Sequence, residues 1–423
     1  MTPLDLFALS LALLAYAAVS ARAARGLVTA PMAFAGFGLA VGGTGLGLMD
    51  LSVSNAFLNR LAEITLALVL FTDASKIDLR RITRQHELPI RLLGIGLPLT
   101  VAFGFALALV AIPELSVPGA LLLAIALAPT DAALGQAVMT NAAVPARIRQ
   151  ALNVESGLND GLAYPALVIA ATLAVAGAPE DAGGWAGFVG AQILLGPAAG
   201  IAIGLAGAAA FSRSAAAGWT DDTYLRLAAL GLALAAYAGA ETVGGNGFLA
   251  AFACGMTVGA RATALRRPID AFAETEGQLL NLTVFALFGA VLVPAILLEA
   301  ESRLIEAFVW RDLLYAALSL TVIRMVPVAL CLLGAGLRMP TVLFLGWFGP
   351  RGLASIIYLL ILIDDYALAE AGRIAPVVLL TVALSIVLHG VTAAPLARRY
   401  GRTARRWTHA RETAPAAALR PEG

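Results

Sequence analysis

Charged residues are scarce in this chain. They make up 13% of its 423 residues, well below the roughly 25% that is typical of soluble domains. Hydrophobic residues account for 60% of the sequence, and the mean hydropathy is +0.87. Because a soluble fold of this length carries more charge on its surface, the composition indicates an integral membrane protein.

Cysteine and histidine are also rare, with two and three residues. Cys254 and Cys331 both fall in apolar segments, which argues against a structural disulfide. His389 is the one histidine within an apolar run, and we interpret it as a packed side chain that donates to a backbone carbonyl. The sequence contains no zinc-site spacing such as CxxC or HExxH and no basic cluster with interleaved aromatics. It therefore predicts no cofactor and no nucleic-acid partner.

Apolar runs of about 20 residues, the length that a helix needs to cross a bilayer, recur along the chain. Runs of this length favour helices over a β-barrel, whose strands alternate over about 10 residues. We therefore predict an all-α membrane protein with about thirteen transmembrane helices. The predicted segments are 4–21, 27–49, 57–73, 88–112, 118–140, 150–176, 184–211, 222–240, 244–260, 277–298, 311–336, 341–363 and 372–396.

The basic residues predict the orientation of these segments, since Lys and Arg gather in cytoplasmic loops. Most of the 28 basic residues fall in alternate loops and in the C-terminal tail. Arg22 and Arg25 follow the first apolar run, which is the wrong order for a cleaved signal peptide. We expect an outside N-terminus and a cytoplasmic C-terminus in a plasma membrane, the inner membrane of a bacterium. Residues 1–396 would form the transmembrane domain, and residues 397–423 a short, basic, solvated tail.

Helix-breaking residues interrupt two segments near their middle, at 127–132 (Leu-Ala-Pro-Thr-Asp-Ala) and at 347–352 (Trp-Phe-Gly-Pro-Arg-Gly). Proline inside a helix removes a backbone hydrogen bond and clashes with the preceding turn. The two breaks become equivalent if the first six and the last six helices form two repeats joined by the seventh. Such repeats are inverted. The sequence thus predicts two inverted six-helix repeats with crossed discontinuous helices 5 and 12, as in many transporters.

Charged side chains occur at membrane depth in four of the segments. Asp160 lies eleven residues after Arg149, about 16 Å along a helix, in a hydrocarbon core about 30 Å thick. By the same measure, Asp131, Arg324 and Arg351 lie near the same plane. A charge in hydrocarbon costs roughly 2.5–3.5 kcal/mol on insertion scales, so this convergence indicates a functional site.

Helical spacing sorts the polar residues of the sixth segment onto two neighbouring faces. Ser156 and Asp160 are four residues apart on one face, and Glu155 and Asn159 are four apart on the other. An unpaired buried charge is costly. Because Glu155 faces away from Asp160, we expect it to form a structural ion pair with Arg324.

A hard monovalent cation prefers several oxygen ligands. Asp160, Ser156, Asp131 and a backbone carbonyl near Thr130, freed by the break at Pro129, form the candidate set. The carboxylate of Asp160 can bind a proton instead of a metal ion. Competition between Na⁺ or K⁺ and H⁺ for this one carboxylate produces antiport without further machinery.

Two further charges have accessory roles that the sequence leaves open. Asp73 ends the third segment, where it either attracts cations at the cytoplasmic mouth or caps the basic loop that follows. Arg351 stands beside a Gly-Pro break, where it either compensates the dipole ends of the broken helices or pairs with Asp73.

At these residues the chain resembles the monovalent cation–proton antiporters, in the branch of bacterial NhaP-type antiporters and animal sodium/hydrogen exchangers. The stretch Glu155-Ser156-Gly157-Leu158-Asn159-Asp160-Gly161 is similar to that branch's Glu-Ser-x-x-Asn-Asp signature. Shorter likenesses are Thr130-Asp131 to its Thr-Asp-Pro motif, Val322-Ile323-Arg324 to its buried arginine, Gly349-Pro350-Arg351-Gly352 to its glycine-rich segment, and Phe71-Thr72-Asp73 to its acidic third helix. Ala132 departs from the family by replacing its usual proline, and this leaves the choice between sodium and potassium open.

The resemblance implies a thirteen-helix inverted-repeat fold in which a dimer domain and an ion-binding core domain interleave. It also implies a homodimer and an elevator-like movement. Asp160 is then the carrier of cation and proton, with Ser156, Thr130 and Asp131 around the ion. Asn159 stands where electrogenic relatives have a second aspartate, which implies electroneutral one-for-one exchange. The resemblance as a whole also implies a role in pH homeostasis.

Three other functional classes fit less well. The alternative is a sodium-coupled organic-anion symporter of similar architecture, but its pocket would be neutral or cationic, which Asp131 and Asp160 oppose. A ligand-gated potassium channel normally has a cytoplasmic sensing domain larger than this tail. An intramembrane hydrolase would need a histidine near Ser156 or a Gly-x-Ser-x-Gly motif, and the sequence has neither. We therefore predict a transporter and not an enzyme.

Overall fold

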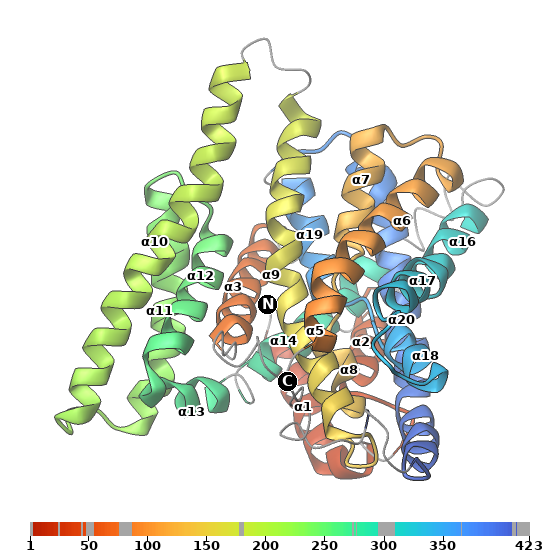
Figure 1. Cartoon of the computed structure of the whole chain (residues 1–423), viewed down its shortest axis with the longest axis horizontal. Coiled ribbons are helices and arrows are strands. Elements are labelled where there is room, and N and C mark those ends of the chain that lie inside the picture. Colours follow the sequence, from red (N-terminus) through yellow and green to blue (C-terminus); the bar gives the residue numbers. More distant parts are fainter. Residues whose placement is uncertain are drawn as a thin grey trace, which may run out of the picture. The chain divides into compact units, whose positions relative to one another are not determined.

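The computed structural model describes residues 3–23, 26–43, 45–47, 55–75, 87–176, 182–272, 275, 277–294, 309–364, 366–407 and 412 (Figure 1). Within these ranges the chain forms helices, turns and bends and no strand, which confirms the predicted all-α class. In the described part of the chain, seven helical stretches are long and apolar enough to cross a membrane. The count of thirteen crossings and the inverted repeats stay predictions.

The chain divides into two compact units. The first comprises Met1–Leu58, Gln85–Ser156 and Asn281–Gly423, and the second comprises Asn59–Arg84 and Gly157–Leu280. Helix α9 (Ala146–Ala176) contributes its first turns to one unit and the remainder to the other. The boundary falls between Ser156 and Gly157, inside the signature of the sixth segment.

The first unit holds most of the described helices. They are α1 (Pro3–Ala23), α2 (Ala30–Val41), α5 (Glu87–Arg91), η1 (Leu92–Gly96), α6 (Leu97–Ala111), α7 (Val117–Ala126), α8 (Ala132–Met139), α14 (Gln278–Leu287), η3 (Phe288–Leu292), α16 (Val309–Leu320), α17 (Val322–Cys331), α18 (Met339–Trp347), α19 (Leu353–Asp364) and α20 (Ala371–Ala404). Its core includes Leu88, Leu92, Val138, Ile148, Val328 and Leu345, all nearly inaccessible.

The second unit contains α3 (Asn55–Ser75), α10 (Ala182–Ala216), α11 (Asp222–Thr242), α12 (Gly247–Arg261) and α13 (Thr263–Phe272). Helices α10, α11 and α12 lie side by side (Figure 1). Glycines let α12 approach α3 closely, because a Cβ at Gly255 or Gly259 would collide with the carbonyls of Phe71 or Ser75. Small residues at such contacts are typical of helix packing in membranes.

Both predicted interruptions are confirmed. Helix α7 ends at Ala126 and α8 begins at Ala132, while α18 ends at Trp347 and α19 begins at Leu353. Ser116 begins α7 with a side-chain cap to the Gly119 N–H. Each break contains a proline, which has no N–H to donate to the preceding turn and therefore interrupts the helical hydrogen bonds.

Other parts of the fold differ from the sequence prediction. The segment 311–336 is two helices that meet at Thr321, whose φ of −117° and ψ of −91° are not helical. An additional helix, α13, lies where we expected a loop. The basic loop after α3, which the predicted orientation uses, lies outside the described residues, as do residues 413–423.

The chain also does not become a solvated tail after residue 396. Helix α20 continues to Ala404, and Tyr400 is buried against Phe344, with ring centroids 4.2 Å apart. Glu412 is 1% exposed and accepts hydrogen bonds from the Arg338 N–H, at 2.8 Å, and the Thr341 hydroxyl, at 3.1 Å. Described residues beyond 396 therefore contribute to the packing of the first unit.

Candidate functional site

One carboxylate joins the two interruptions within the first unit. Asp131 Oδ1 accepts from the N–H groups of Ala133, at 2.7 Å, and Leu134, at 3.1 Å, so it caps α8. Its Oδ2 accepts from the Leu353 N–H, at 2.6 Å, at the start of α19. The Asp131 N–H in turn donates to the Pro350 carbonyl, at 2.8 Å. A negative charge thus faces the positive ends of two half-helices, where it is favoured.

Two glycines make room for the charged side chains at the second interruption. A Cβ at Gly352 would collide with the Asp131 carboxylate, and a Cβ at Gly349 would collide with the Arg324 guanidinium. The glycine-rich character of residues 349–352 therefore has a steric cause, because the side chains of two other segments occupy the space that a Cβ needs.

Arg351 binds the carbonyls at a C-terminal helix end, whereas Asp131 binds the N–H groups at N-terminal ends. The Arg351 side chain is fully buried, and Nη1 donates to the carbonyls of Ala128, at 2.6 Å, and Pro129, at 3.0 Å. These carbonyls follow the end of α7 and lack helical partners because of the break. The contacts match the first of the two roles considered for Arg351. Its Nε and Nη2 have no hydrogen-bond partner among the described residues.

The same contacts limit which carbonyls are available to an ion. The break at Pro129 does release carbonyls, as expected, but those of Ala128 and Pro129 already accept from Arg351. Ser385 was not singled out from the sequence, yet its Oγ accepts from the Arg351 N–H at 2.7 Å. A serine in an apolar helix carries no sequence signal that would have identified this contact.

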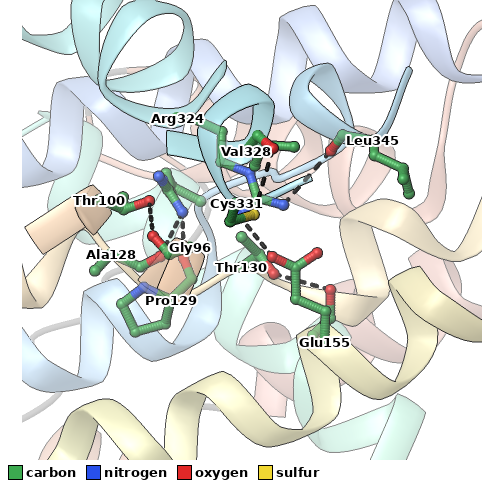
Figure 2. A network of polar contacts seen from close by, with 12 residues as sticks. Gly96, Thr100, Ala128, Pro129, Thr130, Glu155, Arg324, Val328, Cys331 and Leu345 are labelled. Atoms are coloured by element: carbon green, nitrogen blue, oxygen red, sulfur yellow. Dashed lines mark hydrogen bonds and ion pairs between the residues drawn. The ribbon is translucent and has the colours of Figure 1, made fainter. Parts of the chain in front are cut away.

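The structure brings Glu155 and Arg324 together as an ion pair. Arg324 Nη1 lies 2.6 Å from Glu155 Oε1 (Figure 2), and each residue is 2% exposed. A longer contact of 3.5 Å joins Arg324 Nη2 to the Leu345 carbonyl. Within the described chain, Glu155 Oε2 and Arg324 Nε have no hydrogen-bond partner. The pair is therefore buried but incompletely satisfied.

Two hydroxyls add neutral oxygens beside this pair. Thr130 Oγ1 and Ser156 Oγ are 2.9 Å apart, and the residues are 1% and 4% exposed. Thr130 lies in the stretch between α7 and α8, which Figure 2 shows close to Glu155. Of the predicted ligands, Thr130 and Ser156 are thus in direct contact.

The remaining signature residues belong to the second unit. Asn159 and Asp160, on α9, are 1% and 8% exposed. Asp73, on α3, lies against the same helix, because the position that a Cβ would take at Gly157 is 3.4 Å from Asp73 Cγ. Asp73 is half-buried and stands about one helical turn of α9 from Asp160.

His389 is buried next to the second interruption. Its Nε2 lies 2.9 Å from the Trp347 carbonyl, and its Nδ1 lies 3.1 Å from Ser385 Oγ. These contacts are those of the packed histidine that we expected from the sequence. Among the described residues, no cluster of His, Cys, Asp and Glu has the form of a transition-metal site.

Two of three comparisons with known proteins found matches to this chain. A family model described as "Sodium/hydrogen exchanger, transmembrane" matches residues 9–399. Two structures of the sodium proton antiporter MjNhaP1 from Methanocaldococcus jannaschii are similar to this chain. One, determined at pH 8, has 19% identity, a TM-score of 0.73, and coverage of 94% of this chain and 96% of that one. The other has 18% identity, a TM-score of 0.71, and coverage of 95% and 98%. A search of curated proteins finds no match.

Proposed function

This chain belongs to the sodium/hydrogen exchanger family, and from that membership we propose that it exchanges Na⁺ for H⁺ with Asp160 as the shared binding site. The family is one of membrane transporters and not of enzymes, so cation/proton antiport is the function that follows from membership. The finer statements below, about residues and mechanism, are our proposals.

The choice of Asp160 rests on its place in the signature of the sixth segment and on the commitment of Asp131 and Glu155 to other partners. Asp131 accepts three backbone N–H groups, and Glu155 is bound to Arg324 at 2.6 Å. A carboxylate that holds a helix end or a buried arginine cannot release its partner in every transport cycle without a large cost. We therefore assign the exchange of cation and proton to Asp160.

The hydroxyls of Thr130 and Ser156 are the further oxygen ligands that we propose for the cation. Ser156 is four residues before Asp160 on α9, so the two share a helix face. Asn159 supplies a neutral group beside the carrier. With one titrating carboxylate, one Na⁺ replaces one H⁺, and exchange is electroneutral. Asp73, half-buried on α3, attracts cations toward α9 as an accessory residue.

The contacts of Asp131 lead us to assign it to capping in place of the ligand role that its spacing suggested. An Asp131→Ala change is expected to cost about 2 kcal/mol or more, since two helix caps are lost at about 1 kcal/mol each. Asp131→Asn is expected to retain most of the stability and the cation KM, because asparagine also caps helices. Thermal unfolding and cation titration of both variants check this. A cation KM that rises strongly in the well-folded Asn variant would restore Asp131 as a ligand.

The test of the proposed function is transport in proteoliposomes that contain a pH-sensitive dye. Addition of Na⁺ is expected to move protons, and the apparent KM for Na⁺ is expected to rise about tenfold for each pH unit below the pKa of the carrier, because the ligand must be deprotonated. Parallel titrations with K⁺ and Li⁺ establish the preferred cation. An imposed membrane potential of either sign leaves an electroneutral exchange rate unchanged. Absence of cation-dependent proton movement would reject the proposal.

We also propose a homodimer that works by an elevator-type movement in a bacterial inner membrane, with the N-terminus outside, and that serves pH homeostasis. The backbone and carboxylate bonds between the two interruptions support such a movement, because they tie α8 and α19 together. The basic residues of alternate loops support the orientation.

A further inference from the structure

A groove opens on the first unit between helices α17, α18 and α20. It encloses about 370 Å³, which is within the range of small-molecule sites. Its walls are almost entirely apolar and include Met325, Leu343, Phe348 and Leu396. Arg399 is the one charged side chain that lines it in the described chain.

The mouth of the groove lies on a surface that suits hydrocarbon. Leu343, at the groove, is 51% exposed. On α17, Val326 and Leu330 are 36% and 43% exposed. Exposed apolar side chains on neighbouring turns of a membrane-spanning helix contact lipid tails and not water. A lipid of the surrounding bilayer can therefore reach the groove.

Arg399 adds a charge at the end of this apolar surface. The exposed basic residues near the end of α20 are Arg398, Arg399, Arg402, Arg405 and Arg406. Arg399 forms no ion pair with any described residue. Arginines at the end of a membrane helix reach the headgroup layer, where they attract anionic lipids. Charge complementarity thus selects a phospholipid with a net negative headgroup.

We propose that this groove binds one anionic phospholipid, with an acyl chain between α17, α18 and α20 and its phosphate at Arg399. The acyl chain would contact Phe348, which follows the last residue of α18 and begins the second interruption. Met325 also lines the groove and follows Arg324 of the buried ion pair. A bound lipid would therefore stabilise the elements that support the interrupted helix.

The experiment uses the full chain in nanodiscs doped with a photoactivatable phosphatidylglycerol, or with phosphatidylcholine of identical acyl chains. Crosslinks are mapped by mass spectrometry. Phosphatidylglycerol is expected to label the groove residues of α18 and α20 more strongly than phosphatidylcholine. Arg399→Gln is expected to lower phosphatidylglycerol labelling about fivefold, the effect of one basic residue at an anionic surface, and to leave phosphatidylcholine labelling unchanged.

Filling the groove tests its shape independently of charge. Leu343→Trp is expected to reduce labelling by both lipids. The matched controls are Arg402→Gln and Leu330→Trp, which change exposed residues of α20 and α17 that do not line the groove. Gel filtration and thermal unfolding verify that each variant is folded. Equal labelling by the two lipids, or undiminished phosphatidylglycerol labelling in folded Arg399→Gln, overturns the proposal, whatever the transport assay shows.

Discussion

Cation-dependent proton movement is expected to fall to background in an Asp160→Asn variant that still inserts and folds. Asparagine keeps the size and much of the hydrogen bonding of the side chain. It removes both the negative charge that binds the metal ion and the site that takes up the proton. The measurement is dye-reported exchange in proteoliposomes, with protein folding checked by gel filtration.

Two further variants serve as a control and as a conservative replacement. Asp222→Asn removes an exposed carboxylate in the first turn of α11 and is expected to leave exchange unchanged. Asp160→Glu keeps a titrating group but displaces it by one methylene, and is expected to retain reduced exchange with a raised KM. If Asp160→Asn exchanges normally, another residue is the carrier and the proposed site is wrong.

Loss of either partner of the Glu155–Arg324 pair is expected to be the most damaging change to stability. Each residue is 2% exposed, so Glu155→Ala or Arg324→Ala leaves an uncompensated charge in the interior. Such changes typically cost about 3–5 kcal/mol. The double change removes both charges and is expected to cost less than the sum of the single changes. One oxygen of Glu155 already lacks a described partner, which reduces what the intact pair contributes.

A double-mutant cycle on thermal unfolding in detergent measures this coupling directly. Arg373→Ala with Asp312→Ala is a matched cycle, because that ion pair is also short, at 2.7 Å, but its side chains are 17% and 8% exposed. We expect the coupling energy there to be smaller. Strictly additive losses at Glu155 and Arg324 would mean that the pair is not a coupled unit.

The positions of the two interruptions followed from the sequence because proline has an unavoidable local effect. Pro129 and Pro350 each lack an N–H, so both breaks were predictable within a few residues. The presence of buried charges was also predictable, since charge is rare in this chain. Both inferences rest on what a residue does to its own backbone or its own solvation.

The tasks of Asp131 and Arg351 were less accessible to sequence reasoning. Spacing predicts a membrane depth for both, but it does not say toward which distant segment a side chain turns. Asp131 turned out to accept from Leu353, and Arg351 donates to carbonyls more than two hundred residues away. The continuation of α20 beyond residue 396 was missed for a similar reason, because a basic helix end resembles a solvated tail until Tyr400 is seen to be buried.

The bonds between the interruptions bear on how such a protein can change over generations. Asp131, in one stretch, and the Pro350 carbonyl and Leu353 N–H, in the other, hold each other in place. A mutation that changes the backbone of either stretch therefore also changes the stretch that is hydrogen-bonded to it. The two stretches form an epistatic pair, so an alanine in place of the customary proline at position 132 has to be judged together with the proline at position 350.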